Sequence, residues 1–158
     1  MTIALEISYS QLAVFVAHLA NPFNDWTHQH VIQGFSWRPG SVSFGTLDEA
    51  GTMNVEIGTT TRFDESTSSA CRVIRVPFTV LEDGVVEVAS IGSSTTLQLE
   101  PGEYELTFEH GRAPDGTMWA KLHFHRVNEP GKAEVLRADA DLEPSETLVM
   151  TAKPAGER

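Results

Sequence analysis

The stretch Glu103-Tyr104-Glu105-Leu106-Thr107-Phe108-Glu109 alternates between acidic or polar and apolar side chains with a period of two residues. Because successive side chains of a β-strand point to opposite faces, Tyr104, Leu106 and Phe108 are expected to face a core and the three glutamates to face outward. The wider segment from Val76 to Gly111 contains seven carboxylates and neither Lys nor Arg. The sequence therefore predicts a strand whose outer face carries a row of carboxylates without a counter-ion.

Similar strand-like segments, separated by turn sequences, run through most of the chain. They are residues 5–16, 41–44, 53–57, 71–80, 85–91 and 118–127, with a further pair that meets at Pro101-Gly102. Strands at a spacing of roughly 8–12 residues are typical of an antiparallel β-sandwich or a barrel-like domain. One short helix is expected at residues 27–33, with Thr27 as its N-cap and Gly34 after its last residue. The predicted fold class is therefore mainly all-β.

The chain of 158 residues has the length of one domain. We expect residues 1–130 to form this single β-rich domain. Residues 131–158 differ in composition, because they are rich in Ala, Pro, Asp and Glu and hold five acids between Glu134 and Glu146. They are expected to be an acidic C-terminal extension that is partly helical or mobile.

The charge balance limits the class of partner. The chain has 11 Lys and Arg against 22 Asp and Glu, which gives a formal net charge of −11. This excess argues against direct binding of nucleic acid and against an anionic membrane surface, and it favours a basic protein or a metal ion. No apolar run is long enough to insert into a membrane. A single cysteine, Cys71, and the absence of Lys or Arg before Arg38 lead us to expect a cytoplasmic protein.

The pattern His123-Phe124-His125 with Glu129 four residues later is the strongest indication of a metal site. Two histidines at positions i and i+2 of a strand share a face, and this spacing resembles the first metal motif of the cupins. No histidine follows His125, however, so the second ligand of a cupin is missing. We therefore predict no metal, no cofactor and no enzymatic activity, with a cupin-like metalloenzyme as the alternative.

Ten residues are candidates for contact with a basic partner. The carboxylates are chosen by charge, and two tryptophans are added because a binding surface needs an apolar centre. The candidates are Glu82, Asp83, Glu100, Glu103, Glu105, Glu109, Asp48, Glu49, Trp37 and Trp119.

Six short blocks occur in a characteristic order. They are Ile7-Ser8-Tyr9-Ser10-Gln11, Asp25-Trp26-Thr27, Gly40-Ser41-Val42-Ser43-Phe44, Val76-Pro77-Phe78-Thr79-Val80, residues 84–91 and residues 99–106. In this order they resemble the competence protein J family, the DNA-entry nuclease inhibitors, over about residues 5–110. The resemblance implies a protein that binds and silences a basic DNA-degrading nuclease or nuclease toxin, as an inhibitor or immunity protein. The family's contact residues are not transferred to this chain.

If the partner is a nuclease, the carboxylates are expected to bind its DNA cleft. A nuclease holds DNA in a cleft lined with Lys and Arg, so a carboxylate surface can compete with the DNA phosphates, and opposite charge speeds the encounter. Binding outside the cleft is the alternative mechanism. An acidic binding module without a nuclease partner is the alternative function.

Overall fold

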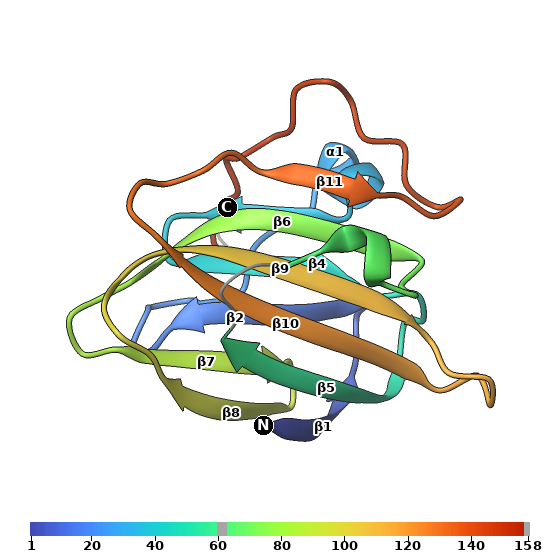
Figure 1. The fold of residues 1–158 in the computed structure, drawn as a ribbon, viewed down its shortest axis with the longest axis horizontal. Helices are drawn as coiled ribbons and strands as arrows, with labels where there is room; N and C mark the ends of the chain where they lie inside the picture. Colours follow the sequence, from blue (N-terminus) through green and yellow to red (C-terminus); the bar gives the residue numbers. More distant parts are fainter. Residues whose placement is uncertain (60–62, 157–158) are drawn as a thin grey trace.

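The computed structural model describes residues 1–59 and 63–156, and in this part of the chain the strands form two facing sheets (Figure 1). The front sheet has the strand order β1 (Thr2–Ile7), β5 (Gly51–Thr59), β10 (Met118–Val127), β9 (Gly102–Arg112), β6 (Arg72–Val80) and β11 (Glu134–Arg137). The back sheet has the order β3 (Phe35–Arg38), β4 (Ser41–Gly45), β2 (Gln11–Val16), β7 (Val85–Ser90) and β8 (Ser93–Gln98). The helix α1 (His28–Gln33) and the 3₁₀ turn η1 (Glu65–Thr67) complete the described elements. The predicted all-β class is confirmed.

Strand β9 has the predicted division of its faces. Tyr104, Leu106 and Phe108 are buried in the core between the sheets. The ring of Phe108 stacks on that of Phe44 from the back sheet, with the centroids 4.5 Å apart. All strand pairs are antiparallel except β5–β10, which is parallel.

The prediction of one strand over residues 5–16 is wrong. The segment forms β1 and β2, which belong to different sheets. Tyr9 and Ser10 between them have φ angles of +55° and +56°, a backbone conformation that favours Gly or Asn. The turn therefore has no Gly or Asn at these positions, and the sequence did not predict it.

The predicted helix is confirmed together with its boundaries. The Thr27 hydroxyl accepts a hydrogen bond from the His30 backbone N–H, and the His30 ring accepts one from the Thr27 N–H. Gly34 ends the helix at φ +90°, and a Cβ there would lie 2.8 Å from the Ile74 side chain. The chain thus turns sharply against the core at a position that only glycine fits. Among the described residues, no helix is long and apolar enough to cross a bilayer.

The C-terminal extension is not helical between residues 131 and 156. Instead β11 pairs with the edge of β6, and the chain then runs in an extended form past α1 and β3. The Gln33 side chain donates to the Val149 carbonyl and accepts from the Val149 N–H, both at 2.9 Å, and Leu142 is buried in the core. The expectation of a partly helical or mobile segment overlooked these contacts because they join residues far apart in the chain, up to 116 positions for Gln33 and Val149. Residues 157–158 of the extension lie outside the described residues.

A buried ion pair ties the extension to β6. Arg72 is 4% exposed, and its Nε and Nη2 donate to the two carboxylate oxygens of Asp139 at 2.7 and 3.1 Å. Its Nη1 donates to the Gly45 carbonyl at 2.7 Å. Burial raises the pKa of Asp139, but the hydrogen bonds from Arg72 and the Asp141 N–H, together with the charge of Arg72, outweigh burial and lower this pKa. A residue of the extension therefore supplies the counter-ion of the buried Arg72.

We predict that Asp139→Ala destabilises the protein by about 3 kcal/mol or more, because it leaves the Arg72 guanidinium buried without its counter-ion. Asp141→Ala is the matched control, since Asp141 is exposed and forms no ion pair in the described structure; its effect should stay within about 0.5 kcal/mol. Urea unfolding at neutral pH measures both. Equal stability of the two variants would contradict the role of Asp139.

Candidate functional site

The ten candidate residues do not form one surface, because the fold distributes them over three places. The outer face of the front sheet carries Glu105, Glu109 and Trp119 on β9 and β10. One end of the sandwich carries Asp48 and Glu49, in the loop between β4 and β5. The other end has the turn between β6 and β7 with Glu82 and Asp83 and the turn between β8 and β9 with Glu100 and, at the start of β9, Glu103, both at the left of Figure 1. Trp37 of β3 lies beside them, because it lines a groove together with Glu103.

On the outer face, Glu109 is buried and cannot belong to an open row of carboxylates. It is 5% exposed, it pairs with the His123 ring of β10, and it accepts a hydrogen bond from the Ser68 hydroxyl. Burial raises the pKa of Glu109, but the hydrogen bonds from His123 and Ser68 outweigh it and lower the pKa overall. Phe63 packs on the His123 ring, with centroids 4.9 Å apart. The carboxylate is thus fully engaged within the protein.

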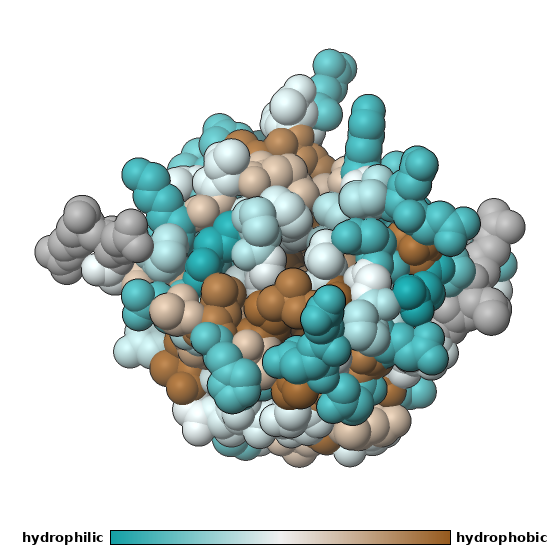
Figure 2. All heavy atoms as spheres, turned by 90° about the vertical axis from the view of Figure 1, so that its left-hand side faces the viewer, coloured by the Kyte–Doolittle hydropathy of each residue, from teal (hydrophilic) through white to brown (hydrophobic). Residues whose placement is uncertain are grey.

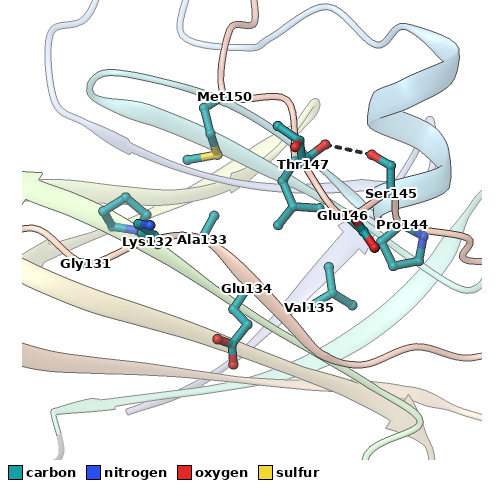
Figure 3. A pocket seen from close by; sticks show the side chains of 12 residues that line it. Gly131, Lys132, Ala133, Glu134, Val135, Pro144, Ser145, Glu146, Thr147 and Met150 are labelled. Carbon is teal, nitrogen blue, oxygen red and sulfur yellow. Dashed lines mark hydrogen bonds between the residues drawn. The ribbon is translucent and has the colours of Figure 1, made fainter.

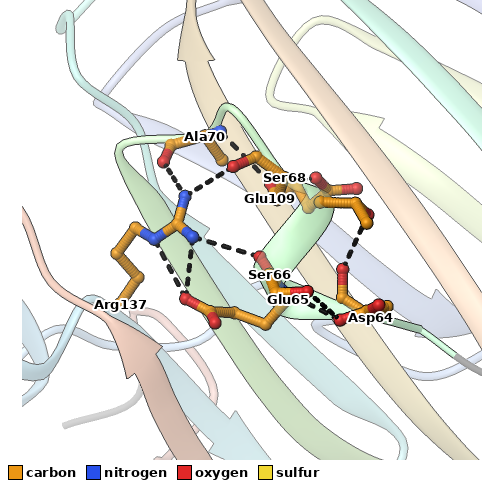
Figure 4. A network of polar contacts seen from close by, with 8 residues as sticks. Asp64, Glu65, Ser66, Ser68, Ala70, Glu109 and Arg137 are labelled. Carbon is orange, nitrogen blue, oxygen red and sulfur yellow. Dashed lines mark hydrogen bonds and ion pairs between the residues drawn. The ribbon is translucent and has the colours of Figure 1, made fainter.

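The segment that covers Glu109 is fastened by the C-terminal extension (Figure 4). Arg137 of β11 donates to the carbonyls of Ser68 and Ala70 at 2.9 and 2.6 Å, and its guanidinium binds the Glu65 carboxylate at 2.8 Å. Five hydrogen bonds from Arg137 to Glu65, Ser68 and Ala70 therefore hold this segment against the outer face.

The other candidates on this face also have cationic neighbours. Glu105 lies 3.8 Å from the Arg75 guanidinium of β6. Trp119 packs above Gly111, where a Cβ would lie 2.9 Å from the indole, and the Lys121 ammonium is 5.7 Å from its ring centroid. The expected row without counter-ions is wrong for this face, because β6 and β10 supply cations that the sequence of β9 does not show.

At the Asp48 end, the carboxylate is neutralised as well. The Arg112 guanidinium donates to the Asp48 oxygens at 2.8 and 2.5 Å, and these hydrogen bonds lower the pKa of Asp48. Glu49 is exposed, and its backbone carbonyl accepts a hydrogen bond from the Ser10 N–H at 2.9 Å.

A buried histidine positions the start of this loop. His110 is fully buried; its Nε2 accepts a hydrogen bond from the Leu47 N–H at 2.9 Å, and its Nδ1 lies 2.8 Å from the Trp119 carbonyl. The ring must be neutral with the proton on Nδ1, since protonated Nε2 would face the Leu47 N–H. Burial lowers the pKa of His110 from 6.5 to about 4.

At the opposite end, three carboxylates have no cationic partner. The Glu82–Asp83 turn and the Glu100–Glu103 turn lie together, because the Leu99 N–H donates to the Gly84 carbonyl at 2.8 Å. Glu100 pairs with Arg126 at 3.0 Å. Among the described residues, Glu82, Asp83 and Glu103 form no ion pair. We call these three carboxylates the acidic rim.

Trp37 lies beside the acidic rim. Its indole N–H donates to the Pro77 carbonyl at 2.8 Å, its ring is half-buried, and it lines a groove together with Glu103. Sequence reasoning missed Leu19 and Leu81, which line the same groove. Leu81 gave a weak signal, as an apolar residue directly before the acidic turn Glu82-Asp83-Gly84.

A second hollow, of about 680 Å³, lies between β11 and residues 144–150 (Figure 3). Its lining includes Lys132, Glu134 and Glu146, and the Ser145 hydroxyl donates to the Thr147 carbonyl at 2.6 Å on one side. Charges of both signs give this hollow no preference for a cationic or an anionic ligand.

The histidines do not form a metal centre within residues 1–59 and 63–156, where no three His, Cys, Asp or Glu side chains could hold an ion together. His123 and His125 share the outer face of β10, but His123 binds Glu109, and Glu129 follows the end of the strand at Val127. Burial raises the pKa of Cys71, which keeps it a protonated thiol and a poor nucleophile.

Comparisons with known proteins agree with this architecture. The family model of competence protein J (ComJ) matches residues 4–127. The DNA-entry nuclease inhibitor of Bacillus subtilis (strain 168) is 28% identical over 103 residues, which cover 65% of this chain and 76% of that protein. The match reaches further than the predicted 5–110 and leaves the extension outside.

Two solved structures share the fold. The crystal structure of ComJ from Bacillus subtilis, described as the inhibitor of the DNA degrading activity of NucA, has a TM-score of 0.65 at 20% identity and covers 80% of this chain and 96% of that one. The structure of crocagin biosynthetic gene J has a TM-score of 0.52 at 14% identity and covers 77% of this chain and 94% of that one.

We predict that the free energy of unfolding falls by about 2 kcal/mol between about pH 7.5 and pH 5 because of His110. Its folded-state pKa lies below the unfolded value, so its contribution is fully present above pH 6.5 and is lost as the pH falls toward about 4. His110→Gln should reduce the pH dependence by this amount, whereas His28→Gln, at an exposed position of α1, should not. Urea unfolding at the two pH values tests it; equal pH dependence of the wild type and His110→Gln would contradict it.

Proposed function

This chain belongs to the competence protein J family, and we propose that it binds and inhibits a DNA-degrading nuclease. The observation that carries the proposal is the family match over residues 4–127. It includes all ten candidate residues and every strand except β11 and the first two residues of β1. The Bacillus subtilis relative is a DNA-entry nuclease inhibitor, which supports an inhibitor rather than an enzyme.

The charge of the protein supports a basic nuclease as the partner. A DNA-degrading enzyme binds a polyanion and therefore presents Lys and Arg in its cleft. The chain carries a net charge of −11, and the acidic rim leaves three carboxylates unpaired within the described structure. These groups are able to pair with the cleft in place of DNA phosphates. Attraction between the negative inhibitor and the positive cleft also accelerates their encounter at low ionic strength.

The proposed compartment is the cytoplasm. The free Cys71 agrees with a reducing compartment. In this compartment the inhibitor would meet the nuclease of its own cell before the nuclease acts on DNA.

We predict that the protein forms a one-to-one complex with a DNA-degrading nuclease of its own cell and stops its cleavage of DNA. A pull-down followed by a DNA-degradation assay measures both, with an unrelated acidic protein of similar net charge as the control. Because exposed charges are screened by salt, the association rate should fall by about tenfold or more between low and physiological salt. Absence of a complex in low salt would overturn the proposed function and leave an acidic binding module with another partner.

The same assay separates two mechanisms of inhibition. If the inhibitor occupies the DNA cleft, a higher DNA concentration relieves the inhibition. If it binds elsewhere, the degree of inhibition does not depend on the DNA concentration, and competition with DNA is excluded.

A further inference from the structure

An apolar groove opens at the end of the sandwich that carries the acidic rim. It has a volume of about 510 Å³, and its apolar lining includes Leu19, Trp37, Pro39, Phe78, Leu81 and Pro130. Figure 2 views this end of the molecule and shows hydrophobic side chains gathered near its centre, with hydrophilic side chains around them.

The groove exists because the two sheets end here without a covering element. Strand β2 ends at Val16, β6 continues into the turn at Leu81, and the turn after β3 brings Pro39 to the same place. Leu81 is 52% exposed, although a polar residue would suit this turn position in an isolated protein. The exposure of Leu81 therefore does not stabilise the chain itself. A contiguous apolar surface with a polar border, such as this groove, is typical of a contact site.

The border of the groove is negative. Glu82 and Asp83 follow Leu81 directly in the chain, and Glu103 lines the groove. Within residues 1–59 and 63–156 these three carboxylates form no ion pair, and the nearby Arg126 is already paired with Glu100. A partner that covers the groove would bury these charges, and it must supply cations to compensate them.

We propose that this groove is the docking surface for the nuclease, an inference that rests on the proposed function. The groove takes one apolar side chain of the nuclease, flanked by Lys or Arg residues that pair with the acidic rim. Such a site has the composition of a protein interface, in which an apolar centre with an anchoring Trp is surrounded by polar groups. Trp37 and Leu81 form the centre, and Glu82, Asp83 and Glu103 form the border.

The other surfaces fit a basic partner less well. The outer face of the front sheet has its carboxylates paired with Arg75 and His123. A third hollow, of about 460 Å³, lies at the opposite end beside Tyr9, but its wall includes Leu142 of the extension, which lies outside the family match. The lining of the groove lies within residues 4–127 except for Pro130.

The test compares matched variants in binding to the same DNA-degrading nuclease of the protein's own cell. Leu81→Ser removes an exposed apolar side chain from the groove, and Tyr9→Ser removes one from the opposite end, where Tyr9 is 72% exposed. Glu82→Lys reverses a charge on the border, and Glu56→Lys reverses an exposed one on the outer face. Unfolding midpoints show that each variant is folded, and surface plasmon resonance gives both rate constants.

We expect Leu81→Ser to raise the dissociation rate by about tenfold or more, because it removes part of the apolar centre. Glu82→Lys should lower the association rate by about tenfold at low salt, with a smaller effect at high salt. Tyr9→Ser and Glu56→Lys should each remain within about twofold of the wild type.

The outcomes distinguish this inference from the proposed function. A wild type that neither binds nor inhibits the nuclease removes both. A wild type that inhibits, with groove variants that bind like the wild type, overturns the docking surface and leaves the inhibitor function intact. Loss of binding only in Tyr9→Ser or Glu56→Lys likewise overturns it and places the contact elsewhere.

Discussion

The structure depends on strand β9, which is hydrogen-bonded along its length to β10 on one side and to β6 on the other. A shift of one residue in either pairing would turn Tyr104, Leu106 and Phe108 outward and carry glutamates into the core. The stack of Phe108 on Phe44 then fixes the front sheet against the back sheet. One alternating strand thus determines both where the core lies and which face carries the carboxylates.

That division of faces creates an electrostatic problem, which neighbouring strands solve in part. Arg75 pairs with Glu105 and His123 with Glu109 on β9, and Arg112 pairs with Asp48 at one end. At the other end, Glu82, Asp83 and Glu103 form no ion pair within the described residues, and they lie beside an apolar groove. The negative charge of the protein is therefore not spread evenly, and the surface that remains available to a cationic partner is small and defined.

The C-terminal extension adds to the family fold without forming a separate core. It covers the edge of β6, supplies the counter-ion of the buried Arg72, and through Arg137 holds residues 63–70 over Glu109. Each of these contacts satisfies a backbone or charged group that burial would otherwise leave at a cost. The extension is thus integrated through polar contacts although the family match ends before it.

Local features of this protein are determined by the sequence itself. The period of two in β9, the Thr27 cap and the Gly34 end of α1, and the turn at Pro101-Gly102 depend on residues close together in the chain, so they were predictable. The order of the motifs likewise indicated the family. Only the tertiary structure decided which cations meet which carboxylates, that residues 5–16 divide between two sheets, and that Leu19, Trp37 and Leu81 share a groove. These features depend on strand order and register, which arise from contacts between distant residues that no local pattern encodes.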